Sequence, residues 1–183
     1  MLFLKLSFKL VVTNTTANMN LTWKKNIASN TKLYENEKQI GSLEKENLFS
    51  NSVIGKIGTE SYYFYKLNFF DSRIIISDIT SKNQQFGTIT FNIWNTRADI
   101  YIGNERYTWL YSNIWNTEWT IIEPNGKKVN FKSVILQGKI TSDTQNQLLL
   151  LVGLFIHNYI QNSTYLVFLI LFIPSLLRLY DKF

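Results

Sequence analysis

Few side chains in this sequence are of the types that enzymes use as nucleophiles, bases or metal ligands. The chain has no cysteine, which excludes disulfides, thiolate metal sites and cysteine nucleophiles. A Ser-His-acid triad would have to use His157, the single histidine, and the sequence has no Gly-x-Ser-x-Gly nucleophile elbow. Since no ligand-type residues accompany His157 at metal-site spacing, we expect a hydrogen-bonded structural histidine on an apolar helix.

The acidic residues are densest at Glu35, Glu37, Glu44 and Glu46. Two carboxylates brought together in space could carry out general acid–base chemistry on a glycoside. These four sit beside lysines at strand or turn positions, which is typical of a solvated face. Phosphate-binding Gly-x-x-x-x-Gly-Lys and Gly-x-Gly-x-x-Gly motifs are also missing. The sequence therefore predicts no catalytic residue, no metal and no cofactor, and a hydrolase is the least favoured function.

Aromatic side chains offer a second kind of chemistry, which is stacking. The tryptophans are Trp23, Trp94, Trp109, Trp115 and Trp119. If exposed, they would stack on bases or sugars or lie at a membrane interface. If buried, they would belong to the wall of a barrel. We expect burial, or half-burial at a barrel rim.

Short extended segments follow one another along most of the chain. Leu2–Val12 is apolar at every second position, which predicts a half-buried strand. Pro124-Asn125-Gly126 is a strong turn signal. About twelve strands at regular spacing predict an antiparallel barrel, because closure removes the sheet edges. The others are expected at Leu21–Lys24, Thr31–Glu35, Gln39–Glu44, Ser52–Ile57, Ser61–Phe70, Ser72–Asp78, Gln84–Trp94, Arg97–Ile102, Glu105–Tyr111, Asn116–Ile122 and Lys128–Leu136.

An apolar helix follows these strands. Ser142 and Gln145 match a capping box, which predicts a helix from about residue 143 to 161. From Leu148 to Ile160 it is apolar on nearly every side and has to be surrounded. A barrel of about twelve strands is too wide to be filled by its own side chains. We therefore expect a mainly β domain at residues 1–161 that encloses a structural core helix containing Leu148, Leu149, Leu151, Val152, Gly153, Phe155 and Ile156.

The order of these features resembles the tubby C-terminal-like group, which includes the LURP-one-related proteins and the phospholipid scramblases. The resemblance covers roughly residues 33–161. It rests on the run of strands, repeated figures such as Ile40-Gly41-Ser42-Leu43 and Gln137-Gly138-Lys139-Ile140, the Glu-Pro-Asn-Gly-Lys turn and the "LLLLVGLF" helix. It implies a twelve-stranded antiparallel barrel around a hydrophobic C-terminal helix. It also implies membrane or phosphoinositide association in some branches, and no established catalysis in the short members.

Two features of the group have no counterpart here. Asp71 and Asp78 are isolated, so the sequence has no Asp-rich calcium loop like that of the scramblases. Calcium-driven lipid scrambling is therefore not expected. The basic residues by which tubby proteins hold phosphoinositide headgroups do not match position by position, and no headgroup-binding residue is assigned.

Residues 162–183 form an additional apolar helical tail. No charge occurs from Tyr165 to Leu177, and Arg178 and Lys182 lie just beyond. Aromatic and basic flanks are typical of a membrane interface, although the length is marginal for a span. Three alternatives stay open: a tail anchor, an amphiphilic helix packed on the barrel mouth or a partner, and a membrane hairpin with a turn at "HNYIQNST".

The charge balance bears on partners. The net charge is +6 with a pI near 9.4, which fits either ordinary solubility or attraction to an anionic surface. The lysines are scattered rather than clustered in a stripe, which argues against nucleic acid. The N-terminus lacks the continuous apolar block of a secretion signal, so we expect a protein in the cytoplasm or on the cytoplasmic side of a membrane.

These observations predict a non-catalytic, membrane-associated or lipid-binding module, with an anionic phospholipid membrane as the expected partner. The alternative is a soluble barrel whose apolar tail binds another protein.

Overall fold

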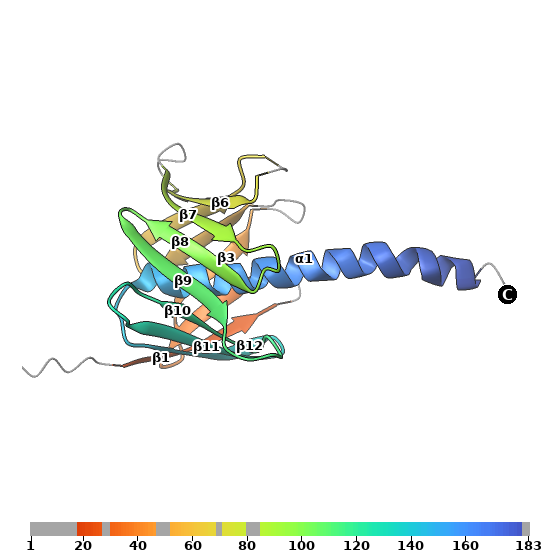
Figure 1. Ribbon diagram of the computed structural model, residues 1–183. Helices are drawn as coiled ribbons and strands as arrows, with labels where there is room; N and C mark the ends of the chain where they lie inside the picture. Colours follow the sequence, from red (N-terminus) through yellow and green to blue (C-terminus); the bar gives the residue numbers. More distant parts are fainter. Residues whose placement is uncertain (1–17, 27–29, 47–51, 69–70, 80–84, 181–183) are drawn as a thin grey trace, which may run out of the picture.

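The structure of the chain is a computed structural model that describes residues 18–26, 30–46, 52–68, 71–79 and 85–180, with side chains of the C-terminal helix up to Thr164 and at Phe172. In these residues it has twelve strands and one helix (Figure 1). They are β1 (Met19–Lys25), β2 (Thr31–Glu35), β3 (Lys38–Lys45), β4 (Val53–Ile57), β5 (Glu60–Tyr65), β6 (Arg73–Asp78), β7 (Gln85–Phe91), β8 (Arg97–Ile102), β9 (Glu105–Tyr111), β10 (Glu118–Ile122), β11 (Lys128–Val134), β12 (Gln137–Ser142) and α1 (Gln147–Tyr180).

The strands form a closed antiparallel barrel, as the sequence predicts. Each strand pairs with its neighbours in sequence, and β1 pairs with β12 to close the sheet, with Trp23 opposite Gly138. Closure satisfies both edges of every described strand. In β11, Val129, Phe131 and Ser133 are buried while the residues between them are exposed. This alternation turns one apolar face of each strand towards the barrel axis.

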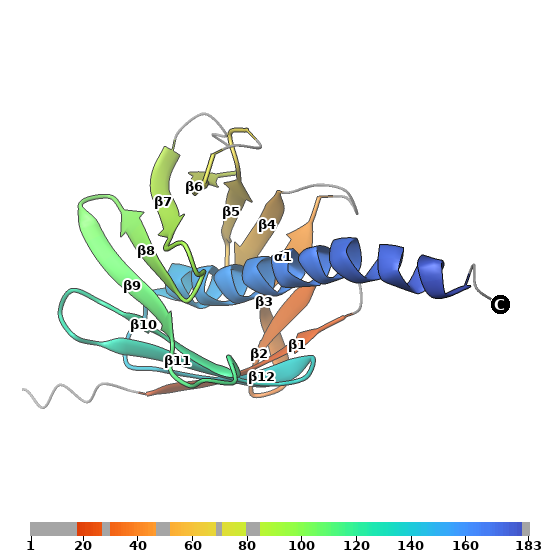
Figure 2. The ribbon, with the colours of Figure 1, turned by 45° about the vertical axis from the view of Figure 1, so that its right-hand side comes forward.

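The first half of α1 runs along this axis and fills the barrel (Figure 2). Phe155 stacks on Phe64 of β5 with ring centroids 4.6 Å apart. Gly153 faces Phe131 so closely that a Cβ atom there would overlap its ring. The predicted core residues Leu148, Leu149, Leu151, Val152, Gly153, Phe155 and Ile156 are all buried. The helix and the barrel therefore bury each other's apolar surface.

The set of strands that forms the barrel differs from the predicted set at both ends of the chain. The expected strand at Leu2–Val12 lies outside the described residues. The last wall position is instead taken by β12, which pairs with β11 and β1 and was not among the strands expected from the sequence. Its short length and its polar first residues give weak alternation, so its strand conformation depends on pairing partners on both sides.

The helix starts later than the capping box predicts. Ser142 is the last residue of β12, paired with Met19 and Val129, and its hydroxyl accepts a hydrogen bond from the backbone N–H of Thr144 at 3.2 Å. Strand pairing on both sides of Ser142 prevents a helix there, and α1 begins at Gln147.

The turn that the hairpin alternative places at "HNYIQNST" does not form, because α1 continues through residues 157–164 without a break. The hydroxyl groups of Ser163 and Thr164 donate hydrogen bonds to the carbonyl groups of Tyr159 and Ile160, four residues earlier. Such bonds keep polar residues compatible with a helix. The continuous helix rules out the hairpin, and the predicted boundary at residues 161 and 162 falls inside one element.

Candidate functional site

His157 lies where α1 approaches the mouth of the barrel. Its ring stacks on Trp119 with centroids 3.7 Å apart and an interplanar angle of 11°, and Nδ1 lies 3.4 Å from the hydroxyl of Tyr111. Burial, with a smaller contribution from Lys25, lowers the pKa of His157 to about 3. The ring is therefore neutral and packed among aromatic side chains, which suits a structural role and not that of a base.

The four clustered acidic residues of the sequence are divided between the two ends of one strand. Glu35 and Glu37 lie at one end of β3 and Glu44 and Glu46 at the other, about 23 Å away at 3.3 Å per residue. The Glu46 carboxylate accepts hydrogen bonds from the hydroxyl groups of Ser52 and Tyr63. Among the described residues, no group of three or more His, Asp or Glu side chains could hold a metal ion.

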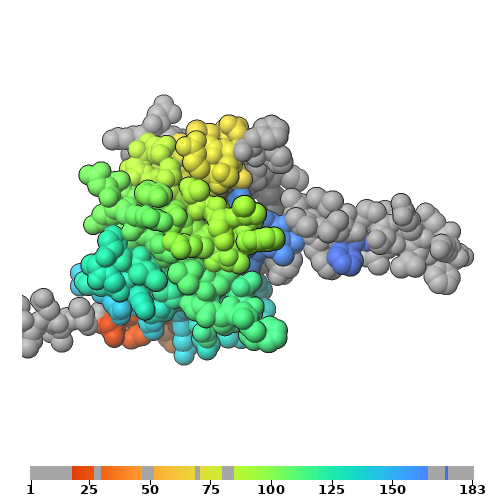
Figure 3. Space-filling model, in the orientation of Figure 1, coloured from red at the N-terminus to blue at the C-terminus, as the bar shows by residue number. Residues whose placement is uncertain are grey.

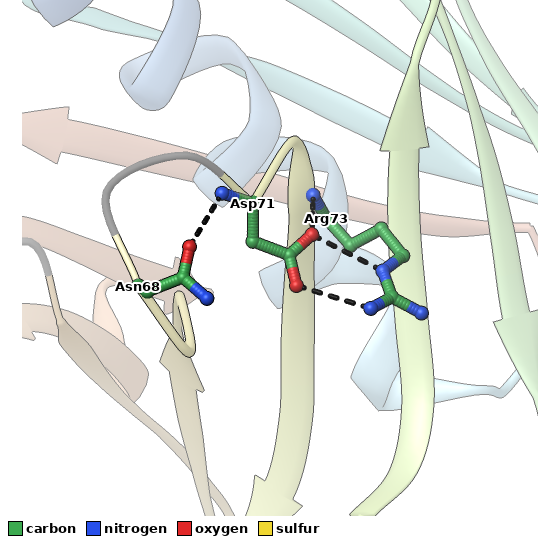
Figure 4. Close-up of polar contacts among 3 residues, drawn as sticks. All are labelled: Asn68, Asp71 and Arg73. Atoms are coloured by element: carbon green, nitrogen blue, oxygen red, sulfur yellow. Dashed lines mark hydrogen bonds and ion pairs between the residues drawn. The ribbon is translucent and has the colours of Figure 1, made fainter.

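Asp71 and Asp78 also lie apart, at opposite ends of β6. Figure 4 shows Asp71 beside Arg73, whose side chain donates hydrogen bonds to both carboxylate oxygens at 3.1 Å, while Asn68 accepts one from the Asp71 backbone. The hydrogen bonds from Arg73 hold the pKa of Asp71 below its usual range. Asp71 therefore links Asn68 to the start of β6.

The two ends of the barrel differ in their relation to α1. We call the end at which α1 starts the entry end and the end at which it leaves the exit end. At the exit end, Lys25 donates a hydrogen bond to Gln161 at 3.3 Å. Asn158 donates one to Thr31 at 2.9 Å. Figure 3 shows α1 emerging from the barrel at this end, opposite the start of β1.

Two turns at the exit end have the same sequence and the same geometry. Residues 92–96 and 113–117 both read Asn-Ile-Trp-Asn-Thr. In each, the side-chain oxygen of the first Asn accepts hydrogen bonds from the next two backbone N–H groups after the tip, and its amide donates to the Thr hydroxyl. Each second Asn has a positive φ, 52° at Asn95 and 55° at Asn116, which asparagine tolerates. The identical pentapeptides therefore build identical turns.

These turns hold their apolar side chains out in solvent. Ile93 and Trp94 are 92% and 82% exposed, and Ile114 and Trp115 are 87% and 78% exposed. The expected burial of the tryptophans is therefore wrong for Trp94 and Trp115, because both stand at turn tips. It holds for Trp23, Trp109 and Trp119, which are fully buried. The repeated pentapeptide was the sequence signal that could have separated the two sets.

A third turn, between β11 and β12, adds Val134, Ile135 and Leu136 to the exposed apolar residues. Ile135 has a φ of 59°, a conformation in which a β-branched residue is strained. Backbone hydrogen bonds tie the three turns to neighbouring strands: Tyr111 N–H donates to Thr96, Ser133 to Thr117 and Lys25 to Leu136. We call the tips of these turns, Ile93, Trp94, Ile114, Trp115, Val134, Ile135 and Leu136, the apolar rim.

A cleft of about 630 Å³ lies between part of the apolar rim and the emerging helix. Its lining includes Trp115, Ile135 and Leu136 from the rim and Ile160 from α1, with Lys25 as the only charged side chain among the lining residues described. Burial, followed by the nearby charge of Lys45, lowers the pKa of Lys25 to about 8. The amine is thus largely protonated at neutral pH, without a carboxylate in the lining.

The balance of charged residues differs between the two ends of the barrel. We counted the charged residues at the first and last positions of the strands and in the described connections between them. Basic residues outnumber acidic ones at the exit end, and acidic residues outnumber basic ones at the entry end. The exit end has Lys25, Lys45, Lys66, Arg73 and Arg97 against Glu46, Asp71 and Glu118. The entry end has Glu35, Glu37, Glu60, Asp78, Glu105, Glu123 and Asp143 against Lys38, Lys127 and Lys128.

Comparisons of the chain with protein-family models, curated proteins and solved structures found no match. The kinship with the tubby-like group therefore stays a prediction. In the part of the chain that the structure describes, no helix has the length and apolar character needed to cross a membrane. The side chains at 165–171 and 173–180, on which the tail-anchor prediction depends, lie outside that part.

Proposed function

We propose that the chain is a non-catalytic, membrane-associated module of the tubby-like and scramblase-like type, which binds an anionic phospholipid surface. The observation that carries the proposal is the continuation of α1 beyond the barrel to Tyr180, with no charged residue between Tyr165 and Leu177. At 1.5 Å per residue, this part of the helix reaches about 24 Å past Thr164. An apolar helix without a barrel around it needs lipid or protein to cover it.

The positive charge of the protein supports an anionic lipid, rather than a neutral one, as the partner of the helix. The net charge is +6, and the excess of basic over acidic residues at the exit end would face the same surface as the helix. An anionic leaflet attracts basic residues by about 1 kcal/mol for each one near the surface, and salt weakens this attraction.

The test compares the full-length chain with a variant lacking residues 163–183, each mixed with phosphatidylcholine vesicles with or without phosphatidylserine. We expect the full-length chain to float with the phosphatidylserine vesicles, less strongly at high salt, and the shortened chain to stay behind. Thermal melting of the shortened chain in solution checks that its barrel is intact.

Two results would overturn the proposal. One is a full-length chain that stays soluble without detergent and does not float with any vesicle, which would favour a protein partner for the tail. The other is flotation that is equal with both vesicle types at low and high salt, which would remove the part assigned to anionic lipid.

A further inference from the structure

We propose that the apolar rim is a membrane-docking surface whose tips insert into the boundary between the headgroups and acyl chains of an anionic bilayer. The barrel then docks on its exit end, with the emerging part of α1 entering the same bilayer. This inference rests on the proposed function and adds to it the surface, the orientation and the residues in contact with lipid.

The distribution of exposed apolar residues carries the proposal. Large exposed hydrophobic side chains are normal when they are scattered singly over a surface. In the described part of this chain, every large exposed hydrophobic side chain except Tyr101 on β8 lies at the exit end or on the helix beyond it. These residues are Leu67, Ile93, Trp94, Ile114, Trp115, Val134, Ile135, Leu136 and Phe172. Clustering on one end, around an apolar helix, marks an interaction surface.

Folding does not explain the residues at these tips. The entry-end turns meet the same demand for a tight reversal with Asn36-Glu37, Gly103-Asn104 and Pro124-Asn125-Gly126, residue types that suit turns. In the Asn-Ile-Trp-Asn-Thr turns, the side-chain hydrogen bonds within the turn come from the Asn and Thr residues and not from Ile or Trp. Ile135 adds strain where Asn or Gly would relieve it.

The chemistry of the rim fits a bilayer better than a protein partner. Trp is the residue type that concentrates at membrane–water interfaces, where an apolar ring and a polar N–H are both accommodated. The tips belong to three separate turns, and the strand spacing places neighbouring turns about 10 Å apart. Separate tips of this kind can each insert between lipid molecules, because a fluid bilayer adapts to their spacing. The basic exit end and the acidic entry end would orient the rim towards anionic lipid.

The experiment uses the full-length chain and vesicles of phosphatidylcholine and phosphatidylserine in which part of the lipid carries brominated acyl chains. Bromine quenches tryptophan only at short range, and Trp23, Trp109 and Trp119 are enclosed in the barrel. We expect quenching in the parent chain and its loss in a Trp94→Phe/Trp115→Phe variant that still binds.

A second variant, Trp94→Ser/Trp115→Ser, tests the contribution to affinity. We expect vesicle binding to weaken at least about tenfold, since each side chain loses apolar burial. Tyr101→Ser, which removes the exposed aromatic outside the rim, is the matched control and should bind like the parent.

The outcomes separate this inference from the proposed function. Parent chain that binds vesicles without tryptophan quenching, or serine variants that bind as tightly as the parent, would overturn the rim as a docking surface and leave the proposed function standing. Absence of vesicle binding by the parent would overturn both. A soluble oligomer in which Trp94 and Trp115 are protected would assign the rim to contact between copies of the chain and would also overturn the inference.

Discussion

The tryptophans of this protein fall into two sets with opposite surroundings. Trp23, Trp109 and Trp119 are fully buried near the enclosed part of α1, whereas Trp94 and Trp115 stand at turn tips in solvent. Within the inner set, Trp23 and Trp119 pack against His157. The outer set touches solvent at the end where the helix leaves. The same residue type therefore contributes to stability in one place and, in our proposal, to membrane contact in the other.

The inner set works through apolar burial and ring packing. The indole N–H groups of Trp23, Trp109 and Trp119 and Nε2 of His157 have no hydrogen-bond partner among the described residues. Unpaired polar groups inside a protein carry a desolvation cost. Burial of the rings has to outweigh this cost, which makes the interior sensitive to lost or added volume.

The largest expected effect comes from adding volume inside the barrel. Gly153→Leu would force a side chain into the ring of Phe131, and a closed wall cannot expand to accept it. We expect the variant not to fold, as judged by the loss of a cooperative thermal transition. Thr164→Leu, at an exposed position of the same helix, is the control and should melt close to the parent.

The next largest effect comes from removing an inner ring. Trp119→Ala should lower the free energy of unfolding by about 3–5 kcal/mol, because it leaves a cavity against His157 and Phe131. Trp119→Phe should cost clearly less, since the indole N–H has no partner among the described residues to lose. Chemical denaturation measures both, and equal losses would show that an undetected polar contact matters more than the ring.

A smaller effect is expected from pH, through His157. Its pKa is about 3 in the fold and 6.5 ordinarily, so between these values the unfolded chain binds more protons than the folded one. The free energy of unfolding contributed by His157 therefore falls as the pH drops below 6.5. Relative to a His157→Gln variant, the parent should lose about 2 kcal/mol between pH 7 and pH 5. Parallel stability curves for the two chains would contradict a buried neutral imidazole.

The smallest effect on stability is expected at the outer tryptophans. Trp94→Ser and Trp115→Ser remove exposed side chains, so each should change the free energy of unfolding by no more than about 0.5 kcal/mol. Denaturation of the two single variants beside Trp119→Ala tests the comparison directly. A loss of several kcal/mol at either tip would show that the rim supports the fold.

Much of the architecture follows from local patterns. Alternation in segments such as Lys128–Val134 and the apolar run from Leu148 to Ile160 predict a barrel around a helix, and the structure has this fold. The helix start near Asp143 was predicted wrongly, and the hairpin alternative, with its turn at residues 157–164, does not form. At Ser142, strand pairing with Met19 and Val129 overrides the capping-box pattern. At Ser163 and Thr164, hydrogen bonds to carbonyl groups four residues earlier keep polar residues within the helix.

The candidate site was less accessible to sequence reasoning. Trp94 and Trp109 both stand in aromatic-rich stretches, and composition does not distinguish a wall position from a turn tip. The separation depends on a difference of a few residues in where β7 and β9 end. The excess of basic residues at the exit end is also invisible in a linear sequence, because Lys25, Lys66 and Arg97 come to the same end only through the antiparallel order of the strands.

The periodicity and composition of the chain were sufficient to specify a barrel of strands and an apolar helix. Burial of the apolar faces of these elements is the main source of folding free energy, and it depends on the residue pattern. Tertiary structure alone decided which end of the barrel gathered the apolar tips and the basic residues, and where the helix emerged. Those properties depend on strand register and barrel closure, which join residues far apart in sequence and have no local signature.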